Sequence, residues 1–146
     1  MRDHVKRLRE LTGAGVMECQ RALEAAGGDL DRAVEVIHER GVSKAEAKRE
    51  RKTGAGLLHS YVHLNRVGVL LELRCETDFV ARSAPFGALA HALAMQIAAM
   101  APGDVEGLLA QPYIRDESVS VGDLLRRTIA QVGENIKLER FVRYEL

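Results

Sequence analysis

An acidic residue stands beside an aromatic one at Asp78-Phe79, in a chain of 146 residues that has no Trp and three Phe. The pair belongs to a short segment, here called the tip (residues 76–82), between a β-rich run at 67–73 and an alanine-rich run at about 84–101. Connections held between rigid elements often carry function, and aromatic side chains anchor many protein interfaces. A lone Phe in a strand-to-helix connection is nevertheless usually buried, so from the residues alone the simpler interpretation is that Phe79 is an ordinary core residue. The alternative is that the tip is a group presented to another protein.

The other side chains with reactive chemistry lack the spacing or the partners that a catalytic or metal site needs. His59 and His63 lie four residues apart on an expected strand, a span of about 13 Å, whereas zinc ligands lie about 2 Å from the ion. Cys75 has no base that the sequence places beside it. Glu76 and Asp78 could bind a cation in a turn, but two carboxylates alone do not define such a site. We expect no enzyme, no cofactor and no metal of the protein's own.

Motifs that hold nucleotide phosphates do not occur in the chain. It contains no G-x-x-x-x-G-K-[ST] sequence, and no G-x-G-x-x-G sequence follows a strand. His91, in the alanine-rich run, has no acid nearby in sequence, and we interpret it as an ordinary helix residue. Direct nucleotide binding by this chain is therefore not expected.

The composition is typical of one globular domain, alone or with a small second one. Hydrophobic residues make up 47% of the chain, charged residues make up 29%, and the formal net charge is zero. Proteins that bind DNA or a membrane surface usually carry a basic excess, so neither partner is expected. Two cysteines form no disulfide framework, and no apolar run is long enough to span a bilayer. The N-terminal ten residues carry Asp3 and Glu10, which argues against a transit peptide, so we expect a cytoplasmic protein.

Residues 1–41 are expected to form a bundle of three short helices. Apolar residues recur there at helical spacing in three runs, and glycines interrupt the pattern after each run, the last at Gly41. Asp29 is placed to cap the third helix. The expected buried positions are Val5, Leu8 and Leu11, then Val16, Cys19 and Leu23, then Leu30, Ala33, Val34 and Ile37.

Residues 42–56 change in composition, because Lys and Arg alternate with Ala and Glu from Lys44 to Lys52. We interpret this segment as an exposed basic linker helix that ends in the sequence Thr53–Gly56. The alternative is a contact for nucleic acid or for the ribosome. Such surfaces usually interleave aromatic residues with basic ones, and this segment has no aromatic residue.

Residues 57–146 favour an α+β core. The runs at 57–64 and 67–73 predict an antiparallel hairpin, and 137–145 predicts a last strand. We expect a three-stranded antiparallel sheet covered on one face by helices, with its other face open to a partner. The long helix has an apolar stripe at Phe86, Leu89, Leu93, Ile97 and Met100, and a later helix has a capping box at Ser120 and Asp123.

Three segments of the chain resemble bacterial elongation factor Ts. Together they lie in the order of that family and cover nearly the whole chain. They are Val5-Lys6-Arg7-Leu8-Arg9-Glu10-Leu11-Thr12-Gly13-Ala14-Gly15-Val16-Met17, followed by Ala22-Leu23 and Gly28-Asp29-Leu30; Glu76-Thr77-Asp78-Phe79-Val80-Ala81-Arg82; and Gly133-Glu134-Asn135-Ile136.

The resemblance implies a guanine nucleotide exchange factor for elongation factor Tu, which releases GDP so that GTP can bind. It implies that the N-terminal bundle is similar to a ubiquitin-associated domain and docks on the partner's nucleotide domain. It also implies that Asp78 and Phe79 disturb the partner's magnesium and phosphate site. The partner-binding residues implied in this way are Arg9, Val16, Met17, Thr77, Asp78, Phe79 and Val80.

Two features of the chain depart from that family. Ser83 stands where the signature usually has Asn or Asp, and all three residues can cap a helix. Longer members carry two related core subdomains, whereas this chain has room for one. Residues 59–63 and 140–145 resemble the second copy, and the tip resembles the first. We therefore expect a homodimer in which two chains supply both copies.

Two other classes of function remain open from the sequence. The bundle could belong to an adaptor that binds ubiquitin-like or helical ligands, although the tip would then have no role. The segment from Lys44 to Lys52 could belong to a ribosome-binding or RNA-binding module, which a steep salt dependence of RNA binding would support.

Overall fold

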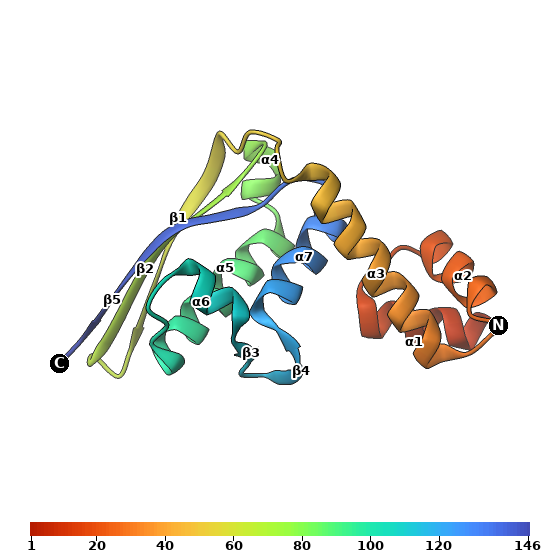
Figure 1. Cartoon of the computed structure of the whole chain (residues 1–146). Coiled ribbons are helices and arrows are strands. Elements are labelled where there is room, and N and C mark those ends of the chain that lie inside the picture. Colours follow the sequence, from red (N-terminus) through yellow and green to blue (C-terminus); the bar gives the residue numbers. More distant parts are fainter.

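The computed structural model describes all 146 residues and shows an α+β chain in which N-terminal helices precede an antiparallel sheet (Figure 1). The fold class expected from the sequence is therefore confirmed. The elements in chain order are α1 (Arg2–Thr12), α2 (Val16–Ala25), α3 (Leu30–Lys48), β1 (Ala55–His63), β2 (Val67–Cys75), α4 (Asp78–Ala81), α5 (Ala84–Met100), α6 (Val105–Ala110), β3 (Pro112–Tyr113), β4 (Asp116–Ser120), α7 (Val121–Val132) and β5 (Lys137–Glu145).

The bundle of α1, α2 and the first half of α3 has its own small core. The Asp29 side chain caps α3 as expected, because it accepts a hydrogen bond from the Arg32 amide at 3.0 Å. Two residues expected inside lie outside: Leu11 and Val16 are 46% and 48% exposed. The buried residues of this core are Leu8, Cys19, Ala22, Leu23, Ala26, Ala33 and Ile37.

The expected end of the third helix at Gly41 is wrong, because α3 continues without a break to Lys48. Gly41 is buried, and a methyl group there would lie 3.6 Å from the Cβ of Ala130 on α7. Helix α3 therefore passes close to α7 at this position, where a methyl group would make an ordinary contact. There is no separate linker helix at 42–56, since its helical part belongs to α3 and its last two residues to β1. The division into 1–41, 42–56 and 57–146 stays a prediction.

The main sheet has the order β1-β2-β5, with both neighbouring pairs antiparallel. The hairpin between β1 and β2 turns at Leu64 and Asn65, whose φ angles of 51° and 59° suit a tight hairpin turn. Helix α5 covers one face of the sheet, with α6 and α7 beside it (Figure 1). Buried side chains on that face of β2 are Val69, Leu71 and Leu73, and those on α5 include Phe86, Leu89, Leu93 and Ile97.

The sequence did not indicate the short strands β3 and β4, which pair with each other. Gln96 of α5 is fully buried and fixes this region, because its amide group donates to the Gln111 side chain and to the Pro112 carbonyl oxygen. Its carbonyl oxygen also accepts from the Ile114 amide at 3.0 Å.

The capping box at Ser120 and Asp123 is confirmed. None of the helices combines the length and the apolar character needed to cross a bilayer.

His59 of β1 and His91 of α5 contact each other, with 3.2 Å between His59 Nε2 and His91 Nδ1. Both sequence interpretations of these residues missed this pair, which joins segments 32 residues apart. Burial, and then the charge of His91, lowers the pKa of His59 below its usual value of 6.5. The folded chain therefore binds a proton at His59 less readily than the unfolded chain does.

Acidification will destabilise the fold through His59. The stabilising effect of the neutral ring is complete above pH 6.5 and is lost as the pH falls below that value, because the unfolded chain then binds the additional proton. We expect the urea midpoint to fall less between pH 7.5 and pH 5.5 in His59→Gln than in the natural chain. His4→Gln, at an exposed position on α1, is the control and should keep the full pH dependence. Equal pH dependence in His59→Gln and the natural chain would contradict the argument.

Candidate partner-binding site

The tip contains a short helix, α4, in which Val80 is buried in the core and the preceding residue, Phe79, is exposed. Strand β2 ends at Cys75, and α4 begins at Asp78 after Thr77, whose hydroxyl oxygen accepts a hydrogen bond from the Val80 amide at 3.3 Å. Val80 is 5% exposed and belongs to the main core, whereas Phe79 is 81% exposed. The interpretation of Phe79 as a core residue is therefore wrong.

Asp78 lies beside Phe79 on the same exposed turn. The Asp78 carboxylate makes no hydrogen bond or ion pair within the chain, and the Phe79 ring is largely exposed. Covering exposed apolar surface with a partner lowers the free energy of the system. The turn thus offers one carboxylate and one aromatic ring to a partner, on a helix whose position the core fixes through Val80.

A carboxylate from a distant segment fixes the backbone of the tip. Glu134 Oε1 accepts hydrogen bonds from the amide nitrogens of Glu76 and Thr77, at 3.1 and 3.0 Å. Glu134 Oε2 accepts from the Thr77 hydroxyl at 2.7 Å. Hydrogen bonds to an ionised acceptor are stronger than those between neutral groups. Glu134 was part of a matched segment in the sequence, but nothing in its spacing indicated that it contacts residues 57 and 58 positions away.

Glu76 does not act with Asp78 as a cation site. Its carboxylate accepts a hydrogen bond from the Asn135 amide at 2.6 Å and lies 3.7 Å from the Arg51 guanidinium. Glu76 therefore joins the tip to the segment after α7. No group of three or more His, Cys, Asp or Glu side chains is placed to hold a metal ion.

Cys75 is buried beneath the tip and has a structural position. Its thiol donates to the Thr77 carbonyl oxygen, with 3.2 Å between the sulfur and the oxygen. Burial, and then the charge of Glu134, raises the pKa of this thiol. A thiol that is buried and protonated is a poor nucleophile.

The partner-binding residues proposed in the bundle lie together around the turn between α1 and α2. Arg9 is exposed in the last turn of α1, and Val16 and Met17 begin α2 with 48% and 59% of their surface exposed. Leu11, in the last turn of α1, is a further exposed apolar residue, with 46% of its surface exposed. Exposed apolar residues of this kind are typical of a surface that another protein covers.

The uncovered face of the main sheet is a second exposed apolar surface, which we call the open face. It consists of alternating residues of the three strands, because successive side chains of a strand point to opposite faces. Leu70 lies near its centre, opposite Ser60 on β1 and Val142 on β5. Glu72 of the central strand, which lies opposite Leu58, forms an ion pair with Arg140 of β5, 3.2 Å apart. The exposed apolar residues of the open face are Leu58, Val62, Leu70, Val142 and Tyr144.

An α+β domain that presents a bare aromatic ring and an uncovered apolar sheet is, by class, a protein-binding module. Residues 76–146 match the family described as Elongation factor TS. The chain is 42% identical to the chloroplastic elongation factor Ts of Cyanidioschyzon merolae, over 100% of this chain and 93% of that protein. It is 41% identical to elongation factor Ts of Thermotoga petrophila, over 99% and 94% of the two chains, and 41% identical to that of Coprothermobacter proteolyticus, over 97% and 95%.

The chain belongs to the elongation factor Ts family, and it is therefore a translation elongation factor. The family resemblance drawn from the three sequence segments is confirmed. The alignment with the Cyanidioschyzon protein extends over 195 positions, whereas this chain has 146 residues, all of which are covered. The relative thus carries internal residues that this chain lacks.

Proposed function

We propose that this protein is a guanine nucleotide exchange factor for elongation factor Tu and acts in the cytoplasm. The observation that carries the proposal is the tip, where a core-anchored helix presents Phe79 with 81% of its surface exposed. In the proposed complex Phe79 enters an apolar pocket between partner helices, and Asp78 lies near the partner's magnesium site. Thr77 and Val80 hold this turn in shape.

The mechanism is a thermodynamic coupling between two ligands of the same partner. The exchange factor binds the partner conformation in which the magnesium and phosphate contacts are poor, so its binding weakens GDP. By reciprocity, GDP weakens the binding of the factor. Magnesium carries a large charge beside the phosphates, so weakening its binding greatly weakens the binding of the nucleotide. No covalent bond changes, and the protein on this proposal is not an enzyme in the usual sense.

The bundle supplies a second contact on the same partner. On this proposal it is a ubiquitin-associated-like unit that docks on the nucleotide domain through Arg9, Val16 and Met17. The exposure of all three side chains supports it. Charge steering contributes little, because the net charge of the chain is zero.

The direct test is the release of labelled GDP from elongation factor Tu, followed by stopped flow with and without this protein. We expect release to accelerate with factor concentration and to reach a plateau. If no acceleration occurs, the exchange function is refuted. Binding to ubiquitin-like ligands, or a steep salt dependence of RNA binding, would then identify the adaptor or the RNA-binding alternative.

We further propose that two chains associate through the open face to form a homodimer. Leu58, Val62 and Tyr144 are 66%, 62% and 75% exposed there, and two such faces would cover each other in a symmetric sandwich. The single core copy in this chain supports the same arrangement, because a second chain would supply the second copy.

A charge at the centre of the open face is expected to separate the dimer. Burying an unpaired carboxylate costs several kcal/mol, so Leu70→Glu should raise the dimer dissociation constant by about 100-fold or more. Sedimentation equilibrium measures this constant. Leu11→Glu is the matched control, because Leu11 is 46% exposed, against 45% for Leu70, but lies on the bundle. A natural chain that sediments with the mass of one chain at micromolar concentration would refute the dimer.

A further inference from the structure

Two consecutive residues after α7, Glu134 and Asn135, bind two distant parts of the chain. Glu134 accepts two hydrogen bonds from backbone amides of the tip and one from the Thr77 hydroxyl, as described above. Asn135 is 8% exposed, and its side-chain amide donates to the carbonyl oxygens of Arg49 and Arg51, at 3.3 and 2.9 Å. These two carbonyl groups belong to the first and third residues after the end of α3. One dipeptide therefore contacts both the tip and the end of α3.

A further pair of contacts closes this network into a ring. The Asn135 main-chain amide donates to the Glu76 carboxylate at 2.6 Å, and the Arg51 guanidinium lies 3.7 Å from the same carboxylate. The network thus joins three segments that lie far apart in sequence. A buried amide whose two donors are both paired is costly to separate from its acceptors, because the amide itself would be left buried without hydrogen bonds.

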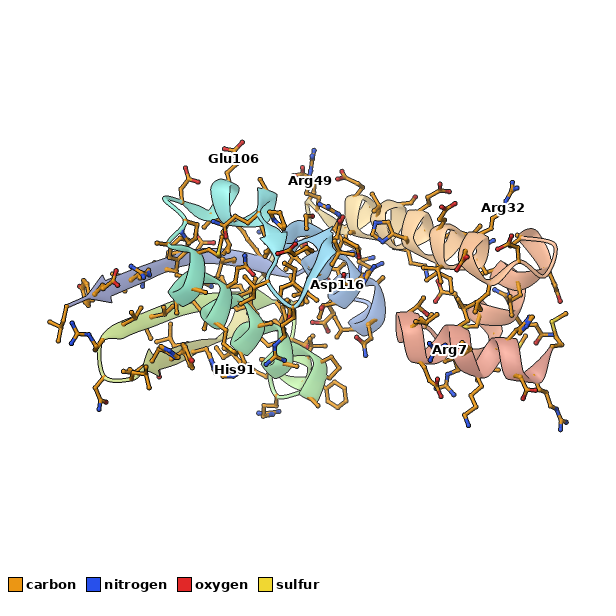
Figure 2. The ribbon with its side chains drawn as sticks, turned by 90° about the horizontal axis from the view of Figure 1, so that it is seen from below. Arg7, Arg32, Arg49, His91, Glu106 and Asp116 are labelled. Carbon is orange, nitrogen blue, oxygen red and sulfur yellow. The ribbon has the colours of Figure 1, made fainter.

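Helix α3 carries the effect of this network to the bundle. Figure 2 shows Arg49 at the core end of α3 and Arg32 at its bundle end. The helix is 19 residues long and forms part of the bundle core at its first half. The position of its last turn relative to the tip, together with the packing of α3 against α7, therefore sets the spacing between the tip and the bundle.

We propose that Glu134 and Asn135 form a clamp, which fixes the tip relative to α3 before the partner binds. This inference rests on the proposed function, in which the tip and the bundle contact the same partner. Two linked contacts strengthen each other only when a single conformation of the protein lets both reach the partner at once. A conformation that is fixed before binding loses less entropy when the complex forms. The clamp therefore acts on affinity, as a pair of positioning residues, whereas Phe79 acts on the exchange step itself.

The clamp predicts a separation of kinetic parameters in the GDP-release assay. Glu134→Ala and Asn135→Ala should each raise the factor concentration for half-maximal release about tenfold, with the maximal rate within about twofold of the natural chain's. Glu134→Gln keeps one acceptor oxygen and should recover part of the affinity. Glu117→Ala removes an exposed carboxylate on β4 and is the control, expected to change neither parameter. Clamp variants that lower the maximal rate as Phe79→Ala does would overturn the proposal.

Amide hydrogen exchange in the free protein tests the clamp without any partner. In Asn135→Ala the Thr77 amide keeps its own acceptor, Glu134, so faster exchange there means that the constraint runs from α3 to the tip. We expect exchange at Thr77 to be about tenfold faster, and Asn135→Ser gives the same test in a milder variant. Unchanged exchange at Thr77 in both folded variants would overturn the clamp even if the natural chain releases GDP. Faster exchange in a chain that releases no GDP would support the clamp and refute the proposed function.

Discussion

Replacement of Phe79 by Ala is expected to lower the maximal rate of GDP release from elongation factor Tu by about 30-fold or more. The reason is that the ring, on the proposed mechanism, binds most tightly in the partner conformation that releases GDP, so the loss of its contact raises the barrier to release. Aromatic side chains buried at the centre of an interface typically contribute about 2 kcal/mol or more, and each 1.4 kcal/mol is a factor of about ten. Phe79 is the most exposed aromatic residue of the chain, and it is carried on a helix that the core holds in place. The loss should therefore appear in activity alone.

The stability of the same variant distinguishes a binding role from a structural one. Because 81% of the Phe79 surface is exposed, its truncation should change the thermal midpoint by no more than about 2 °C. Leu64→Ala is the matched control, since Leu64 is 76% exposed at the other end of the β1–β2 hairpin. GDP release by Leu64→Ala should equal that of the natural chain. A Phe79→Ala variant with full activity would leave the exchange function standing and refute the role of the aromatic ring.

Elements whose residues repeat with a regular period could be predicted from the sequence. Strand β5 was expected at residues 137–145 and is found there, and α5 ends one residue before its expected limit. In both, one face of the element is buried, and the hydrophobic pattern records that burial directly. That Phe79 is exposed could be predicted only from the family resemblance, because an exposed residue contributes to no hydrophobic period.

Features that depend on contacts between distant segments could not be predicted. Gly41 looked like the end of a helix, because the sequence contains no sign that α7 approaches it. Val16 fitted a helical stripe but lies at the outer edge of the bundle. Glu134 was visible as one charged residue in a matched segment, while its partners in the tip lie more than 50 positions away. Tertiary contacts of this kind override local pattern.

Two glycines of the Thr53–Gly56 segment provide a stability test with a built-in control. Gly56 has a φ of 154°, and a methyl group at its Cβ position would lie 2.3 Å from the Leu73 carbonyl oxygen. Gly54 has no atom within 4 Å of the same position. Since β2 is paired on both sides, it cannot move away from β1 without loss of sheet hydrogen bonds. The two substitutions by Ala should therefore have very different effects.

We expect Gly56→Ala to lower the free energy of unfolding by about 3 kcal/mol or more, and Gly54→Ala to leave it within about 0.5 kcal/mol, as measured by urea denaturation. The effect should extend to function, because Gly56 pairs with Arg74 at the end of β2 that leads into the tip. A strand displaced there would move the tip away from the groups that hold it. Gly56→Ala should thus lose GDP-release activity under conditions where it is still folded, whereas Gly54→Ala should retain it. Equal stability of the two variants would show that β1 and β2 do not approach each other as closely as this structure requires.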